Sequence, residues 1–279
     1  MKQFTACMKK DWLETTRTYK FWVMMLCAVG MAFLTLLLLV IMDIAGIGEI
    51  SEIAGEDIAI LFRNSYFNSV SFFASFITTY FMLIMVILFC SSISKEITSK
   101  KWLTPVSAGI KPRNLILSKI LTTFYSIMGA LIVGCLVHLL VTVLYCSPQP
   151  EDFTGTVYQI QDLLYCYAML LVFTAFMCLL TVILNAIIKK GWIVATIIIV
   201  FLVLFPEVLG SIMVGDATLV SYSPFLFMYQ GLPESFSTGI TIPAVTTTQW
   251  IVSSGVTAVI IGALLIGAIF SNKVKAYEK

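Results

Sequence analysis

Charged residues are scarce in this sequence. Only 11% of its 279 residues are Asp, Glu, Lys or Arg, whereas 59% are hydrophobic and the mean hydropathy is +0.99. Soluble globular domains have roughly 25% charged and about 45–50% apolar residues, so a soluble fold is excluded. We expect an all-α integral membrane protein that forms one membrane domain over residues 1–279.

The motifs of several catalytic classes are also missing. The sequence has no GxxxxGK[ST] loop for nucleotide phosphates, and neither GxSxG nor HExxH occurs. Its seven cysteines are scattered and lack CxxC or Cys/His spacing; a bridge between Cys146 and Cys166 is conceivable but not expected. We therefore expect no catalytic residue, metal or cofactor in this chain, no nucleic-acid partner, and no ATP hydrolysis by the chain alone.

Long apolar runs dominate what is present. A helix needs about 20 residues to cross a hydrocarbon core of about 30 Å. Spans are predicted at 21–42, 64–94, 120–147, 163–188, 192–209 and 250–270. Pro206 and Glu207 predict an interruption of the fifth span. Residues 210–248 contain Pro and Gly but no Lys or Arg, and we expect short re-entrant helices there on the extracellular side.

The first 20 residues predict an amphipathic helix. On a helical projection, the basic residues Lys2, Lys9, Lys10, Arg17 and Lys20 fall within an arc of roughly 100°. Phe4, Met8, Trp12 and Tyr19 lie opposite, which favours a helix in the membrane interface over a plain basic flank. The apolar run begins only at Phe21 and has no small-x-small cleavage site, so a cleaved signal peptide is not expected.

The basic residues also predict the orientation. One side of the membrane can hold both termini, residues 94–119 and the 189–191 turn. That side then carries every Lys and Arg except Arg63. By the positive-inside rule that side is the cytoplasm. We expect a multi-pass protein of a bacterial-type plasma membrane with both termini cytoplasmic. Residues 94–119 are then a cytoplasmic segment between spans two and three.

Few residues within the spans carry polar chemistry. His138 lies in the middle of the third span, where a proton relay and a hydrogen bond to a neighbouring helix are both open, the second being favoured. Glu207 lies either at the outer interface or in a water-filled cavity. The aromatic second span and Glu207 are candidates for a substrate path: Phe72, Phe73, Phe76, Tyr80 and Glu207. Small residues four apart allow close helix packing at Ala130/Gly134, Ala258/Gly262 and Ala263/Gly267.

The sequence resembles the permease subunit of ABC-2 type transporters, the type V exporter fold. The shared layout is an amphipathic N-terminal elbow helix, six spans, a cytoplasmic coupling helix between spans two and three, and broken helices between spans five and six. The most specific stretch is KWLTPVSAGIKPRNLILSK at 101–119. Positions that match the family pattern there are Leu103, Thr104, Pro105, Val106, Ser107, Lys111 and Lys119. Two further matches are Lys10-Asp11-Trp12 and Ser223-Pro224-Phe225. Asp11 replaces the usual Glu, and Trp102 replaces an acidic or small residue.

The resemblance implies partners and a role for particular residues. Two copies of a separate ATPase subunit, which carry ATP and Mg, would supply the energy, and a second permease subunit, identical or homologous, would complete the path through the lipid bilayer. Coupling to the ATPase is implied for Glu96, Lys100, Lys101, Trp102, Leu103, Pro105, Asp11 and Trp12. Buried aromatic residues carry much of the energy of protein interfaces, so Trp102 with Leu103 is expected to anchor the contact.

We expect the chain to be a transport subunit and not an enzyme, moving an amphiphilic cargo such as a drug, a lipid or an antimicrobial peptide. Two alternatives stay open. A membrane-embedded enzyme would use His138 and Glu207. An ion-coupled secondary transporter usually has paired charges within its spans, and only these two residues are available for that role.

Overall fold

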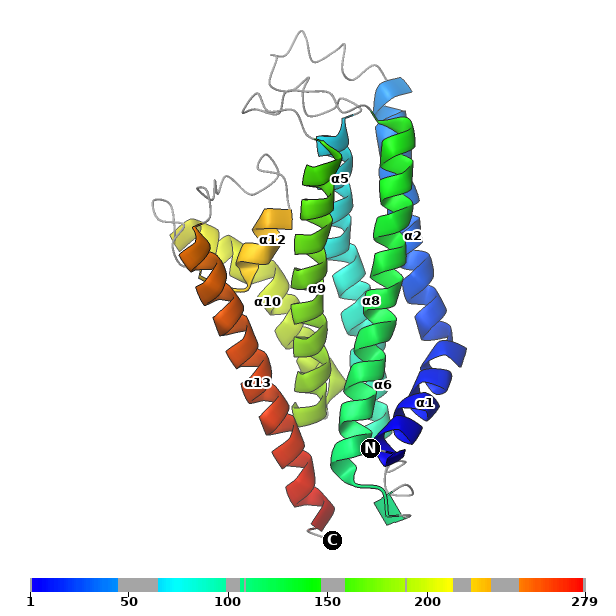
Figure 1. The fold of residues 1–279 in the computed structure, drawn as a ribbon, viewed down its shortest axis with the longest axis vertical. Coiled ribbons are helices and arrows are strands. Elements are labelled where there is room, and N and C mark those ends of the chain that lie inside the picture. The colour runs from blue at the N-terminus through cyan, green and yellow to red at the C-terminus, as the bar shows by residue number, and fades with distance from the viewer. Residues whose placement is uncertain are drawn as a thin grey trace.

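The computed structural model describes residues 2–44, 65–98, 106–107, 109–146, 159–188, 190–212, 222–231 and 246–277. These residues form an elongated bundle of helices (Figure 1). In chain order the elements are α1 (Lys2–Arg17), α2 (Tyr19–Ile44), α5 (Tyr66–Phe76), the π-helix η1 (Ile77–Phe81), α6 (Met82–Thr98), α8 (Pro112–Tyr145), α9 (Ile160–Ile188), α10 (Gly191–Ile212), α12 (Phe225–Gly231) and α13 (Thr247–Tyr277). For the described residues, the prediction of an all-α fold is confirmed.

Five helical segments are long and apolar enough to cross a membrane, so the chain is a multi-pass membrane protein. They are Tyr19–Ile44, Tyr66–Cys90, Arg113–Tyr145, Ile160–Ile188 and Thr247–Ile269. Each contains one of the predicted spans or nearly all of it. The fifth predicted span falls in α10, whose described apolar part, Gly191–Leu202, is shorter. A sixth span therefore stays a prediction.

Two helix boundaries differ from the sequence-based expectation. The third span was expected to begin at Ile120, but α8 already begins at Pro112, so its first turns include Arg113 and Lys119. Proline suits the first turn of a helix because the amide it lacks would have no partner there. In α10 the helix continues past Pro206 to Ile212, so the predicted interruption is wrong for the backbone. Proline removes one backbone donor without ending this helix.

Several helix starts have side-chain caps that the sequence encodes locally. Ser65 Oγ accepts a hydrogen bond from the Asn68 amide at 3.2 Å and caps α5. At α13, Thr246 Oγ1 accepts from the Gln249 amide at 3.4 Å, and Gln249 Oε1 accepts from the Thr246 amide at 2.7 Å. This reciprocal pair is a capping box, which satisfies two amides that a helix start leaves without partners.

Helices α2 and α8 pack most closely at two small residues. The buried side of α2 consists of Met24, Ala28, Ala32, Thr35 and Leu39. A Cβ atom placed on Gly134 of α8 would lie 2.8 Å from Ala28 Cβ. The expected close packing at Ala130/Gly134 is thus confirmed as a contact within the chain. Gly262 has nothing within 4 Å of such a Cβ atom, so Ala258/Gly262 makes no comparable contact here.

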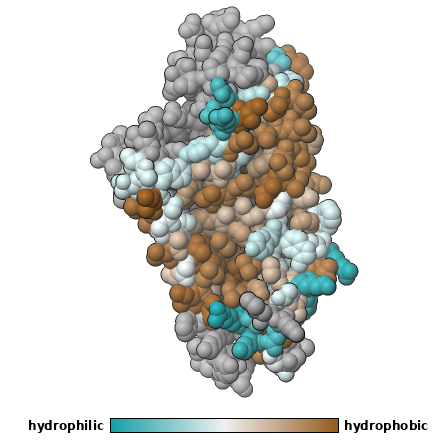
Figure 2. All heavy atoms as spheres, viewed as in Figure 1, coloured by the Kyte–Doolittle hydropathy of each residue, from teal (hydrophilic) through white to brown (hydrophobic). Residues whose placement is uncertain are grey.

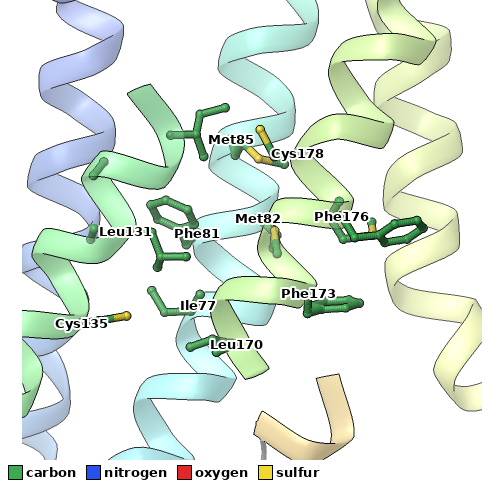
Figure 3. Close-up of a cluster of buried hydrophobic side chains, with 14 of the residues drawn as sticks. Ile77, Phe81, Met82, Met85, Leu131, Cys135, Leu170, Phe173, Phe176 and Cys178 are labelled. Atoms are coloured by element: carbon green, nitrogen blue, oxygen red, sulfur yellow. The ribbon is translucent and has the colours of Figure 1, made fainter. Parts of the chain in front are cut away.

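The core lies where the second span meets α8 and α9 (Figure 3). The π-helix η1 interrupts this span, and the buried Ile77 and Phe81 lie at its two ends. A π-turn inserts an extra residue and rotates the faces of the helix on either side of it. Most residues of α5 before η1, and Met82 and Met85 of α6 after it, face the interior.

Between α10 and α13 the structure describes one short helix, α12, which packs against α9. Phe225 is 1% exposed and its ring centroid lies 5.7 Å from that of Phe173 on α9. Ser253 of α13 donates a hydrogen bond to the Ser223 carbonyl at 2.7 Å. The predicted helical structure within 210–248 is present at 225–231; Ser223 and Phe225 fix it to the bundle.

The two ends of the bundle differ in charge. The start of α1, the end of α13, the start of α8 and the α9–α10 turn lie at one end, here called the terminal end (Figure 1). Described basic side chains of α1 are Lys9, Lys10 and Arg17, and those near that end include Lys111, Arg113, Lys119 and Lys190. At the other end Asp43 accepts a hydrogen bond from Tyr145, and Asp162 caps α9. Figure 2 shows hydrophobic residues over most of the middle of the visible face.

Candidate functional site

Helix α1 is held against α8 by a buried carboxylate. Cys7, Asp11 and Thr15 lie four residues apart and form the buried face of α1. Ser118 Oγ of α8 donates a hydrogen bond of 2.5 Å to Asp11 Oδ2. A charge-assisted bond of this kind is among the stronger hydrogen bonds in proteins. Asp11 therefore fixes α1 to the first turns of α8, within the last residues of the predicted coupling segment 94–119.

The chemistry of Cys7 follows from the same contact. Burial raises the pKa of the Cys7 thiol, and the negative charge of Asp11 raises it further. Both effects disfavour the thiolate, which is the reactive form of cysteine. Cys7 thus packs in the buried face of α1, with its thiol favoured over the thiolate.

The side of α1 away from its buried face has exposed side chains. Trp12 is 41% exposed and Leu13 is 44% exposed, and Lys9 and Lys10 lie on the surface. Of the two predicted coupling residues in α1, Trp12 is accessible to a partner whereas Asp11 is committed to Ser118. The Lys10-Asp11-Trp12 run thus has one residue that anchors the helix and two that are exposed.

The coupling segment itself is described only in part. Lys100, Lys101, Trp102, Leu103 and Pro105 lie outside the described residues. Glu96 is in α6, but its side chain is not among those described. Val106 is followed by a turn in which its carbonyl accepts a hydrogen bond from the Gly109 amide at 3.0 Å. Gly109 has φ of +85°, a conformation that glycine adopts without steric cost, and it turns the chain into α8.

A second polar cluster lies in the bundle interior around His138, which is fully buried on α8. Ser69 Oγ of α5 lies 3.1 Å from Nε2, and the Tyr167 hydroxyl of α9 lies 2.5 Å from Nδ1. Ser69 Oγ also lies 2.8 Å from Thr142 Oγ1. Phe73 stacks on the imidazole with ring centroids 4.0 Å apart. The cluster links three helices, and both ring nitrogens have hydroxyl partners.

This arrangement confirms the interpretation of His138 as a histidine satisfied by neighbouring helices. A neutral imidazole has one donor and one acceptor nitrogen, and a hydroxyl can take either role, so Ser69 and Tyr167 satisfy both nitrogens in either tautomer. Unsatisfied polar atoms are costly in the interior of a membrane protein, which explains why all the partners come from within the bundle.

The aromatic residues of the predicted substrate path do not share one face. Phe73 is buried against His138 and Tyr167. Phe76 and the exposed Tyr80 form a pair with ring centroids 5.9 Å apart, and Phe72 is half-buried. Glu207 lies in α10, and its side chain is not among those described. The substrate path stays a prediction, with Phe72, Phe76 and Tyr80 as its accessible described members.

Cysteines and acidic residues form no further site in the described part of the chain. All seven cysteines are free thiols, so Cys146 and Cys166 are not bridged. Among the described residues, no group of three or more His, Cys, Asp or Glu side chains is arranged to bind a metal ion.

Sequence reasoning missed Ser118, Ser69 and Tyr167. Each contacts its functional partner from a distant point in the chain; Ser118 and Asp11, for example, are 107 residues apart. A partial signal exists, because Thr142 follows His138 at helical spacing and extends one polar stripe along α8.

The chain was compared with known protein families and with curated proteins. No model of a known protein family matches the chain, and a search of curated proteins finds no match.

Proposed function

We propose that the chain is the permease subunit of an ATP-binding cassette exporter of the ABC-2 type. The observation that carries this proposal is the contact between α1 and α8, in which the buried Asp11 is bonded to Ser118. Through it, an amphipathic N-terminal helix is attached to the start of α8, which contains the last part of the basic segment 94–119. A force applied to either element is then transmitted to both.

The terminal end of the bundle faces the cytoplasm in this proposal. Described basic residues gather in α1 and near that end, and the positive-inside rule assigns such an end to the cytoplasm. Helix α1 then lies in the membrane interface as an elbow helix. Tyr19, at the start of α2, is exposed and suits this position, since aromatic residues favour the headgroup region.

A separate ATPase subunit docks on the cytoplasmic segment and on the exposed side of α1. Trp102 and Leu103 supply the apolar anchor, with Pro105 stiffening the turn. Lys100, Lys101 and Glu96 form the polar rim. Trp12 contributes from α1, while Asp11 acts indirectly by holding α1 in place. Two ATPase copies carry ATP and Mg, and two permease subunits form the path.

The cargo is an amphiphile such as a drug, a lipid or an antimicrobial peptide. Tyr80 is 53% exposed beside Phe76 in the middle of an apolar span, where an aromatic surface suits a partly apolar molecule. The enzyme alternative needs a His138 that substrate can reach, whereas the imidazole is fully buried with both nitrogens bonded. No described contact favours that alternative.

The proposal is tested by isolating the tagged full-length chain from its native membranes in mild detergent. We expect a soluble ATPase to accompany it and the preparation to hydrolyse ATP, whereas the chain stripped of that partner does not. Transport of an amphiphile that follows an ion gradient and is indifferent to ATP would overturn the proposal.

A further inference from the structure

Asn185 stands out in the bundle because no hydrogen bond of normal geometry reaches its buried amide group. It lies on α9, is 0% exposed, and neither Oδ1 nor Nδ2 has a hydrogen-bond partner. Buried side-chain polar atoms in native proteins nearly always have a partner, and an exception calls for a physical explanation.

Two other buried polar residues of α9 do have hydrogen-bond partners. Thr174 and Thr181 are also buried on α9, and each bonds to the carbonyl four residues earlier, at 2.8 Å and 2.7 Å. A polar side chain on this helix can therefore satisfy itself locally. On α6 the buried Cys90 thiol lies close enough to the Asn185 side chain for a weak interaction, but no hydrogen bond of normal geometry joins them.

Water can supply the missing hydrogen bonds. A buried water molecule typically needs two to four polar contacts, and the two amide atoms with the weakly polar thiol provide them. The distance to the solvent is short, since Asn185 is three residues before the end of α9 and a helix rises about 1.5 Å per residue. The exposed Lys190 follows directly at the terminal end of the bundle.

We propose that Asn185 is an internal water-binding site between α6 and α9, filled from the terminal end of the bundle. The seam between these two helices is hydrated as far as Cys90 and dry beyond it. Cys178 marks the dry part, because it lies two turns deeper on α9 in the apolar core with Met82 and Met85 (Figure 3). This inference does not depend on the proposed transport function.

Cys90 and Cys178 give a matched pair of reporters for the test. Two full-length variants keep only one of these thiols, with the other cysteines replaced by alanine, and both are treated in membranes with a small cationic methanethiosulfonate that dissolves in water. Both thiols are almost completely buried, at 1% and 0% exposure, so exposure alone predicts equal and slow labelling. With water at Asn185, Cys90 is labelled at least tenfold faster than Cys178.

Substitution of Asn185 then tests whether water bound at this residue causes the faster labelling of Cys90. Asn185→Leu in the Cys90 variant removes both polar atoms and is expected to lower the labelling rate to that of Cys178. Asn185→Thr is the second variant, since its hydroxyl can bond within the helix as Thr181 does, and it should have the same effect. Equal rates for Cys90 and Cys178 in the parent variants, or a Cys90 rate unchanged by these substitutions, would overturn the inference.

Discussion

Phe73 of α5 and His138 of α8 stack almost face to face, with ring centroids 4.0 Å apart and ring planes at 11°. The same imidazole contacts the hydroxyls of Ser69 and Tyr167. One side chain thus joins the second, third and fourth spans. We regard the cluster as the structural centre of the bundle, and the α1–α8 contact as the place where the bundle meets its proposed partner.

Replacing His138 tests whether the His138 cluster stabilises the bundle. His138→Leu leaves the buried Tyr167 hydroxyl without this partner and removes the stacking on Phe73. We expect the free energy of unfolding to fall by roughly 3 kcal/mol, from lost packing and an unsatisfied hydroxyl. Denaturant unfolding in micelles measures it. The control is Leu136→Ala on the exposed side of the same helix, where a change of about 0.5 kcal/mol is expected.

Tyr167→Phe isolates one bond of the cluster. It removes only the hydroxyl that lies beside Nδ1, and we expect a loss of about 1–2 kcal/mol in unfolding free energy. Because both residues share this bond, the losses of Tyr167→Phe and His138→Leu should not add in the double variant. Additive losses would show that the two side chains act independently.

The α2–α8 contact predicts opposite effects for two glycines of one helix. Alanine favours a helix over glycine by about 1 kcal/mol, so Gly129→Ala, where nothing lies within 4 Å, should stabilise the protein. Gly134→Ala places a methyl group 2.8 Å from Ala28 Cβ and should destabilise by about 1–3 kcal/mol. Thermal unfolding compares the two, and adding Ala28→Gly should restore part of the loss. Equal effects at both positions would contradict the close contact.

The pH dependence of Cys7 labelling tests the environment of the buried face of α1. Burial and the charge of Asp11 raise the thiol pKa, so the thiolate is scarce at neutral pH and labelling should increase only at higher pH than for an exposed cysteine. Asp11→Asn removes a charge that raises this pKa, so the midpoint should move to lower pH. A midpoint that stays the same or rises would show that Asp11 is not close to Cys7.

The sequence predicts the elements of this fold better than their contacts. Five spans follow from apolar runs, because length and hydropathy are local properties. The start of α8 at Pro112 was missed because basic residues can occupy a helix that extends beyond the hydrocarbon core. The partners of His138 and Asp11 could not be predicted, since each lies on another helix and packing alone decides which hydroxyl meets which polar group.

If an ATPase docks on the basic segment between α6 and α8, removing the Trp102 side chain should release it. Tagged wild-type, Trp102→Ala and Trp192→Ala chains are isolated from native membranes, and the ATPase retained by each is quantified. Trp192 is the control, because it is 72% exposed at the start of α10 and outside the proposed contact. We predict an ATPase bound to the wild type and to Trp192→Ala, and at least a tenfold loss with Trp102→Ala. The absence of an ATPase from the wild-type preparation, or equal retention by all three chains, would contradict the account.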